Sequence, residues 1–422
     1  MKFKTIAFAG LSLCFIYACK GNNSQETENS DGESISLPSK EVVNENPQKK
    51  VTLPMIVTPN VYLENSASMK GYNDKNCNGF TSVMSELVGV YGRSHTKAYF
   101  YSDGLSKAYD ANKFADMVAS KQVKYGNSSP IHIIIDSIIK KNNSISFLIT
   151  DGIMSGSDEQ IRNNPQYNIN YREELQNSLS DKIKGKGLAA SIYQFESFYN
   201  GTYYCYDNTK VELSQNRPFY VIALGKTTCI IDFKNKVAKE LSYFKPKNEV
   251  HFGIYDFPVP ISIYAGVQGK IDTINNTISI EPAKIRKYGK EISGQYNLDL
   301  SVPLPDYLPT YMKTKEYIET NLSIYFNDEE LDNEKQIFYN ETTETLHIYI
   351  GLQEILKDNS LHIAFKYSLP TWCKKESTDN DKNIKSEMFP TTFNLEYLIK
   401  GLQNGIEPTI NEIMNVQFKI KK

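Results

Sequence analysis

The alternation of short apolar runs with segments of helical period between Pro54 and Phe244 limits the possible folds more than any other feature of this chain. The apolar runs predict strands at 55–64, 96–103, 144–151, 188–198 and 217–225. The segments between them predict helices at 78–93, 112–120, 130–141 and 171–187. This alternation favours an α/β domain over residues 51–244, with a mostly parallel sheet and helices on both faces.

One connection in this domain lacks a helical stripe. Residues 199–216, YNGTYYCYDNTKVELSQN, lie between the last two predicted strands. We expect an extended excursion or hairpin here, which would leave the final strand antiparallel at an edge of the sheet. Its tyrosines fit either an aromatic surface for sugar or protein contact or cross-strand packing, and packing is favoured. The tyrosines are Tyr199, Tyr203, Tyr204 and Tyr206.

The character of the chain changes after Lys245. Short β-rich runs such as NTISIEP, YNLDLSVPL and TLHIYIGL replace the helical segments. Strands of this size and spacing predict one or two β-sandwich-like modules over residues 245–422. Residues 392–406 near the end predict a short helix. The expected fold class is therefore an α/β domain followed by a β-rich C-terminal region.

The N-terminus has the pattern of an export signal. A basic start precedes an apolar stretch at residues 5–18, which is shorter than the roughly 20 residues that span a bilayer. The run IYAC at its end resembles a bacterial lipobox, which implies removal of residues 1–18 and lipidation of Cys19. An ordinary signal peptide with an incidental cysteine is the alternative. Lys20, where enteric bacteria use aspartate for inner-membrane retention, favours the outer membrane.

The polar composition of residues 19–50 and the net charge of the whole chain indicate which kinds of partner the protein can have. Residues 19–50 are almost all polar and predict a disordered tether between the lipidated cysteine and the folded part. With 47 basic and 49 acidic residues the formal charge is −2, which argues against nucleic acid as a partner. We expect a protein of the bacterial cell envelope that contacts the membrane through its lipid anchor and binds a protein partner there.

Four cysteines remain beyond the signal and the anchor. They are Cys77, Cys205, Cys229 and Cys373, and no CxxC spacing suggests a metal cluster. Disulfides are compatible with an exported protein, and sequence proximity makes Cys205 and Cys229 the expected pair.

Oxygen-bearing side chains occupy three loops at one edge of the predicted sheet. Glu64, Ser66 and Ser68 follow the first strand, Ser129 lies in the loop YGNSSP, and Asp151 ends the run LITD. Ligands of open α/β sheets gather at the carboxyl ends of the strands. Carboxylate and hydroxyl oxygens are the ligands that hard divalent cations select. These loops therefore predict a cation site with an open position.

The order strand, ENSASM, helix, strand, GNSSP, helix, strand, LITDG resembles a von Willebrand factor type A (vWA) domain, a Rossmann-like fold, over residues 55–225. The metal-ion-dependent adhesion site (MIDAS) of that family combines D-x-S-x-S, a threonine from a second loop and an aspartate after the central strand. The resemblance implies Mg²⁺, with Mn²⁺ or Ca²⁺ as alternatives, and an acidic group of a protein partner that completes its shell. The implied ligands are Glu64, Ser66, Ser68, Ser129 and Asp151.

Two of these positions depart from the family pattern. Ser129 replaces a threonine and keeps its hydroxyl. Glu64 replaces an aspartate, and the added methylene moves its carboxylate by about 1.5 Å, whereas Mg²⁺ coordination at about 2.0 to 2.1 Å tolerates little displacement. Glu64 either binds the ion directly, in place of a bridging water, or anchors the loop in a site that has lost the metal.

Binding is the expected function, in metal-assisted protein interaction or adhesion. The first alternative is a structural or assembly component with a degenerate metal site. A metal-dependent hydrolase with Ser66 or Ser68 as nucleophile is the least favoured, because no general base or catalytic motif accompanies them. Asp158, in SGSDE, is interpreted as a helix cap and not as a ligand.

Overall fold

The structure is a computed structural model. The predicted signal and tether lie outside the residues it describes, as do Cys19, Cys77 and Ser129. Among the described residues, no helix has the length and apolar character needed to cross a bilayer. The described residues are 57–74, 78–102, 104–127, 130–141, 144–254, 262–265, 269–274, 277–282, 284–287, 290–293, 296–304, 308–331, 335–340, 342–352, 359–386, 390–407 and 412–421.

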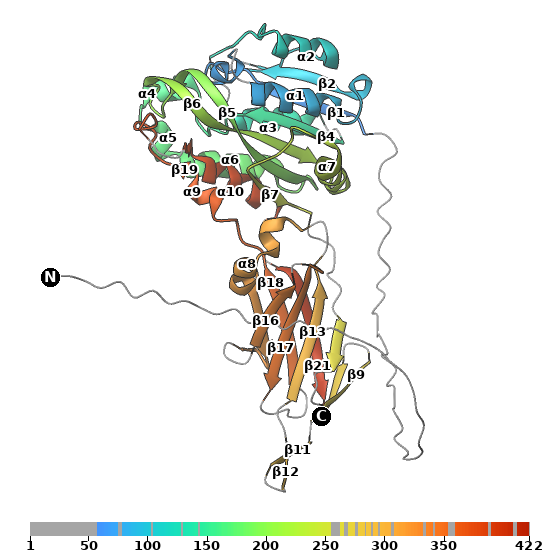
Figure 1. The fold of residues 1–422 in the computed structure, drawn as a ribbon. Coiled ribbons are helices and arrows are strands. Elements are labelled where there is room, and N and C mark those ends of the chain that lie inside the picture. The colour runs from blue at the N-terminus through green and yellow to red at the C-terminus, as the bar shows by residue number, and fades with distance from the viewer. Residues whose placement is uncertain are drawn as a thin grey trace, which may run out of the picture. The chain divides into compact units, whose positions relative to one another are not determined.

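A seven-stranded sheet forms the centre of the α/β domain, in the order β3-β2-β1-β4-β6-β5-β7 (Figure 1). β1 pairs in parallel with β2 and with β4, so the carboxyl ends of these three strands meet at one edge. The strands are β1 (Pro59–Glu64), β2 (Lys97–Tyr101), β3 (Tyr109–Asp110), β4 (Ile145–Thr150), β5 (Ala189–Tyr204), β6 (Lys210–Gly225) and β7 (Asn248–Phe252).

Beyond β4 the sheet is antiparallel. β5 and β6 pair along all 16 residues of each strand, which confirms the hairpin expected over residues 199–216. β6 is antiparallel as predicted, but it lies between β4 and β5 and not at an edge. The predicted edge position is wrong because the hairpin continues both strands, and β7 pairs with β5 on its other side.

Helices cover both faces of this sheet. Phe80 of α1 packs against Phe219, and Phe233 of α7 packs against Phe147, with ring centroids 5.2 and 4.5 Å apart on one face. α3 and α6 contact each other on the opposite face. α1, α2, α3 and α6 confirm the four predicted helices. α7 was not predicted, although its buried Cys229, Ile230 and Phe233 recur at helical spacing. The helices are α1 (Asn78–Gly89), α2 (Ala111–Ala119), α3 (Ile131–Lys140), α4 (Asp158–Asn163), α5 (Tyr167–Asn170), α6 (Arg172–Ile183) and α7 (Thr227–Glu240), with 3₁₀ turns η1 (Ser68–Asn73) and η2 (Arg93–His95).

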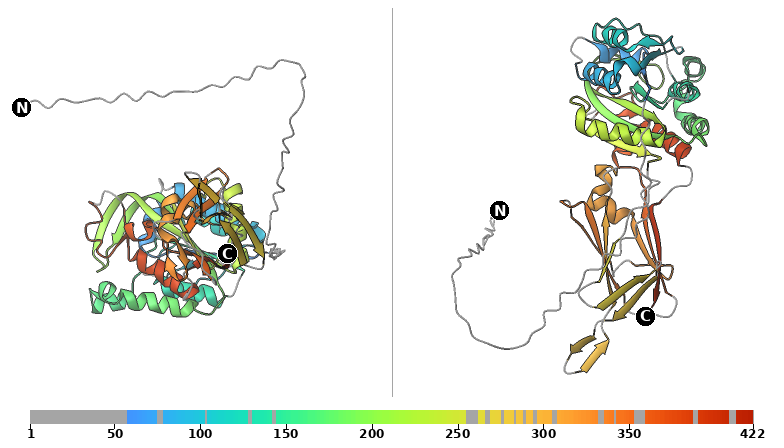
Figure 2. Two further views of the ribbon diagram at one scale, coloured as in Figure 1. Left: turned by 90° about the horizontal axis from the view of Figure 1, so that it is seen from below. Right: turned by 90° about the vertical axis from the view of Figure 1, so that its right-hand side faces the viewer.

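Separate and largely antiparallel sheets make up the β-rich region (Figure 2). Alternate residues of β17 and β18 are buried, as in sheets covered on one face. One sheet has the order β15-β14-β18-β21-β10-β9, a second β16-β17-β13-β8 and a third β11-β12. The strands are β8 (Ser262–Ala265), β9 (Gly269–Ile274), β10 (Thr277–Pro282), β11 (Lys284–Lys287), β12 (Lys290–Ser293), β13 (Tyr296–Pro303), β14 (Leu322–Phe326), β15 (Glu329–Glu330), β16 (Lys335–Asn340), β17 (Thr345–Leu352), β18 (Asn359–Lys366) and β21 (Glu412–Lys421), with η3 (Thr310–Lys313) and α8 (Lys315–Asn321).

Residues 367–386 and 390–407, here called the returning segment, leave β18 and pack on the α/β domain before β21 begins. The helix predicted at 392–406 is confirmed as α10, which lies beside α6 (Figure 1). Gly401 and Gly405 allow this close approach, since a Cβ at Gly405 would lie 2.8 Å from the Cβ of Ile183. The elements of the segment are α9 (Trp372–Lys375), β19 (Ser377–Thr378), β20 (Thr392–Phe393) and α10 (Leu395–Ile406).

The expected disulfide between Cys205 and Cys229 is not formed. Both thiols are free and buried, as is that of Cys373. Cys205 follows β5, whereas Cys229 lies just beyond the end of β6 that pairs with the start of β5. The 16-residue ladder separates these two ends by roughly 50 Å at about 3.3 Å per residue, far beyond the reach of a disulfide.

Candidate metal and ligand site

The parallel pairing of β1 with β4 brings two of the predicted loops together. The ladder places Glu64, the last residue of β1, beside Thr150, the last residue of β4. Ser66 and Ser68 lie in the turn that follows Glu64, and Asp151 follows β4 directly. Four of the five predicted ligands therefore come from adjacent strand ends.

Hydrogen bonds tie the second predicted loop to the first. The amide N of Ala67 donates to the carbonyl of Asn127 at 3.2 Å. The side chain of Asn65 donates to the carbonyl of Lys124 at 2.7 Å. Ser129, the fifth predicted ligand, lies two residues beyond Asn127 and outside the described residues.

Two serine hydroxyls and the Asp151 carboxylate form a continuous chain. Ser68 Oγ donates to Asp151 Oδ2 at 2.6 Å, and Ser66 Oγ lies 3.0 Å from Ser68 Oγ. Because the single hydroxyl proton of Ser68 is used toward Asp151, Ser66 is the donor of the second bond. Asp151 Oδ1 accepts from the amide N of Ile153 at 3.1 Å, which fixes the orientation of the carboxylate.

Glu64 is held by a residue that sequence reasoning missed. Thr150 Oγ1 donates to Glu64 Oε2 at 2.5 Å and accepts from the amide N of Gly152 at 3.0 Å. Thr150 is fully buried and Glu64 is 5% exposed. The sequence shows a threonine directly before Asp151 in LITDG. That this threonine contacts Glu64 can be predicted only when the register between β1 and β4 is known.

Neighbouring groups offset only part of the cost of burying a negative charge on Glu64 or Asp151. Burial raises the pKa of Glu64 well above its usual value, and the negative charge of Asp151 raises it further. Burial also raises the pKa of Asp151, although the hydrogen bond from Ser68 and the positive charge of Arg217 oppose this. Arg217, a second residue that sequence reasoning missed, is 2% exposed and lies 4.7 Å from the ring centroid of Tyr203.

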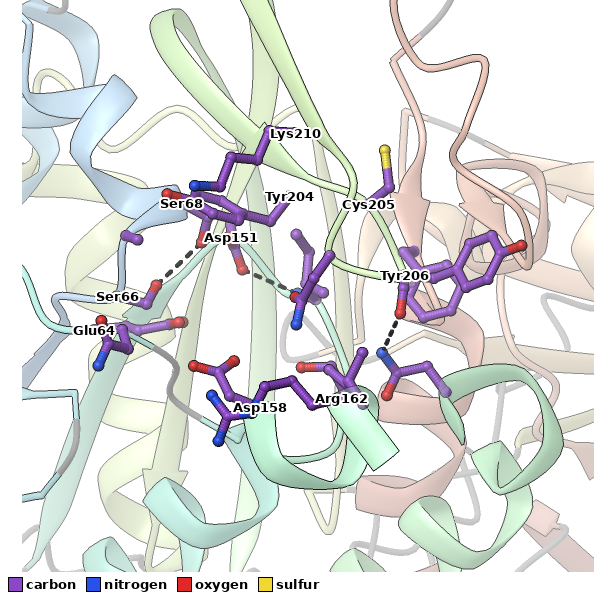
Figure 3. Close-up of a pocket in the computed structure, with 18 residues that line it drawn as sticks. Glu64, Ser66, Ser68, Asp151, Asp158, Arg162, Tyr204, Cys205, Tyr206 and Lys210 are labelled. Atoms are coloured by element: carbon purple, nitrogen blue, oxygen red, sulfur yellow. Dashed lines mark hydrogen bonds between the residues drawn. The ribbon is translucent and has the colours of Figure 1, made fainter. Parts of the chain in front are cut away.

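The carboxyl and hydroxyl groups line one end of a cavity of about 480 Å³ (Figure 3). Glu64, Ser66, Ser68 and Asp151 all contribute to this end. Other walls come from α4, from the turn of the β5–β6 hairpin and from Phe393 of the returning segment. A volume of this size is typical of sites for small molecules or short peptide segments, commonly about 300 to 1,000 Å³.

The oxygen atoms fit the coordination of a hard cation. Neighbouring oxygens of octahedral Mg²⁺ at about 2.0 to 2.1 Å from the ion lie about 2.9 Å apart. The 3.0 Å between Ser66 and Ser68 matches this spacing, and the 2.6 Å between Ser68 and Asp151 requires a small lengthening. Among the described residues no three His, Cys, Asp or Glu side chains gather as metal ligands, so this set depends on hydroxyl oxygens.

Two smaller sequence expectations have different outcomes. Ser157, and not Asp158, is the N-cap of α4, with a capping box to Gln160, and Asp158 instead lines the cavity. The Asp158 prediction was wrong because Ser157 precedes it with a free hydroxyl and Gln160 at the right spacing. The hairpin tyrosines Tyr199, Tyr203 and Tyr206 are buried. Tyr199 and Tyr206 pack on Tyr72 and Phe393, which lie outside the hairpin, so cross-strand packing stays a prediction.

Comparisons of the chain with protein-family models, with curated proteins and with solved structures find no match. Function must therefore be inferred from the chemistry of the cavity.

We predict that the ion-free protein loses free energy of unfolding as pH rises above about 4.5, the ordinary glutamate pKa. Because the pKa of Glu64 is raised in the folded state, the folded protein holds a proton that the unfolded chain releases, and this stability is lost as pH rises through the folded pKa. Urea unfolding across a pH series measures the effect.

The Glu64→Gln variant should lose the part of this pH dependence that comes from Glu64, because it cannot titrate, and should keep the part that comes from Asp151. Glu174→Gln, at an exposed position on α6, is the matched control and should keep both parts. Equal pH dependence in the wild type and in Glu64→Gln would contradict the prediction.

Proposed function

We propose that this protein binds a divalent cation at Glu64, Ser66, Ser68, Ser129 and Asp151, and through that cation an acidic group of a protein partner. The ion is Mg²⁺, with Mn²⁺ or Ca²⁺ as alternatives. Bound there, it supplies positive charge and an open coordination position. The protein would act in metal-assisted protein interaction or adhesion, as its resemblance to the vWA family implies.

One observation carries this proposal. The side-chain oxygens of Ser66, Ser68 and Asp151 form a hydrogen-bonded chain just beyond the carboxyl ends of the parallel strands β1 and β4. These side chains line a cavity that is open to a ligand. Burial disfavours the ionised forms of Glu64 and Asp151, and of these two pKa values the positive charge of Arg217 lowers that of Asp151 alone. A divalent cation would supply positive charge to both groups and favour both ionised forms.

The order of the sheet supports a vWA-like and Rossmann-like fold. Its positions β2-β1-β4 follow the doubly wound order in which strand 1 lies at the topological switch point. The antiparallel β3 next to β2 and the antiparallel β6 next to β4 depart from an all-parallel arrangement. Neither of them pairs with β1, so the switch point between β1 and β4 keeps its parallel geometry.

A structural or assembly role with a degenerate metal site is the second candidate. The hydrogen bond from Thr150 to Glu64 favours it, because a protonated and anchored glutamate can hold the loop without any ion. Glu64→Asp separates the two candidates. Shortening the side chain should tighten ion binding if Glu64 only occupies a former ligand position, and should weaken it or leave it unchanged if Glu64 is itself a ligand.

Calorimetric titration with Mg²⁺, Mn²⁺ and Ca²⁺ tests the proposal. We expect binding in the millimolar range or tighter, and a loss of at least about tenfold in Ser68→Ala and Asp151→Asn, since each removes an oxygen ligand. Asp181→Asn, which neutralises an exposed carboxylate on α6, is the control and should bind the ion like the wild type. Absence of ion binding in the wild type would refute the metal-dependent function.

We further propose that lipidation of Cys19 anchors the protein in the cell envelope, in the outer membrane. Cys19→Ala should abolish incorporation of radiolabelled palmitate during expression in a bacterial host. Cys14→Ala, which replaces the other cysteine of the signal region, is the matched control and should remain labelled. Labelling of Cys19→Ala at the wild-type level would contradict the anchor.

A further inference from the structure

The cavity that holds the candidate cation site has two basic side chains on its other walls, besides the acidic Asp158 of α4. Arg162 of α4 and Lys210 at the start of β6 both line it, and both are exposed (Figure 3). We call these two residues the basic rim. The same cavity therefore has an acidic end, where a cation fits, and a basic rim outside it.

Lys210 is positioned by the hairpin. It pairs with Tyr204 across the end of the β5–β6 ladder, and its ammonium lies 5.6 Å from the Tyr204 ring centroid. Among the described residues Lys210 has no ion-pair partner within 4.0 Å. The neighbouring Lys382 differs, because it forms a 2.9 Å ion pair with Asp207. Lys210 is thus a cation of the cavity with which no carboxylate of the described residues pairs.

Arg162, on the wall formed by α4, likewise has no ion-pair partner among the described residues. Asp158 lies four residues earlier on α4 and lines the same cavity, but no ion pair within 4.0 Å joins it to Arg162 in the described part of the chain. The planar guanidinium can bind a carboxylate through two parallel hydrogen bonds. The two basic side chains therefore face the cavity with unused capacity for an anion.

The cavity also has an apolar wall. Tyr206 stacks on Phe393, with ring centroids 5.9 Å apart and an interplanar angle of 22°. Phe393 comes from the returning segment, and Asn394 beside it donates to the carbonyls of Met154 and Asn168 at 3.2 and 3.1 Å. The wall is therefore fixed to the loop that follows Asp151, and it can cover the backbone of a bound segment.

We propose that the ligand of this cavity is an acidic peptide segment of a partner protein with at least two carboxylates. One carboxylate completes the shell of the cation, and the second binds the basic rim. The inference rests on the proposed function, which supplies the cation. It adds that Arg162 and Lys210 determine which acidic segments are accepted, since a single acidic group leaves both of them unpaired.

Peptides with defined acid spacing test the proposal on the full chain, purified in detergent with Mg²⁺. The probes are capped glycine peptides with two aspartates separated by zero to three glycines, and matched peptides in which the second aspartate is asparagine. Fluorescence anisotropy should show that at least one diacid spacing binds about fivefold or more tightly than its single-acid match. Arg162→Gln and Lys210→Gln should each reduce this preference, and both variants should still bind Mg²⁺.

Lys186→Gln, in the exposed turn after α6, is the matched charge control and should keep the preference. Equal binding of diacid and single-acid peptides, with Mg²⁺ still required, would refute the claim that the basic rim binds a second carboxylate. The proposed function would not be affected by that result. Failure of Mg²⁺ to bind at all would instead overturn the proposed function. Stronger binding of heparin than of every diacid peptide would overturn the peptide as the ligand class.

Discussion

The parallel pairing of β1 with β4 is the constraint on which the site depends. It places Glu64 and Thr150 side by side and sends the two following loops out at the same edge of the sheet. Hydrogen bonds between neighbouring side chains then orient the two carboxyl groups, from Thr150 to Glu64 and from Ser68 to Asp151. A shift of one residue in this register would turn these side chains to the other face and separate the oxygens.

The electrostatics of the site follow from the same packing. Burial at the strand ends disfavours the charged forms of Glu64 and Asp151, and hydrogen bonds from Thr150 and Ser68 compensate only in part. A buried pair of carboxyl groups in this state can keep a proton or take up a cation. The cavity beside it, with Arg162 and Lys210 exposed, provides the access that a cation and its acidic ligand need.

The sequence predicted those features that local periodicity and strand order determine. Apolar patterning predicted five helices, which are α1, α2, α3, α6 and α10. The rule that ligands gather at parallel strand ends predicted the convergence of Glu64, Ser66, Ser68 and Asp151.

Features that depend on long-range pairing could not be predicted. The interior position of β6 requires knowledge of which strands pair, and the role of Thr150 requires the register. Phe393 reaches the cavity from a segment more than 200 residues beyond Asp151, after an intervening β-rich region, and no local pattern indicates such a return. The wrong pairing of Cys205 with Cys229 has the same origin, because sequence proximity hid the length of the hairpin.

The most direct test of the central claim is a crystal structure of the protein soaked in Mn²⁺, with diffraction recorded at an energy where manganese scatters anomalously. We predict one anomalous peak within about 2.2 Å of Ser66 Oγ, Ser68 Oγ and an oxygen of Asp151. A map that shows manganese elsewhere, with the hydrogen bond from Ser68 to Asp151 intact, would contradict the cation site.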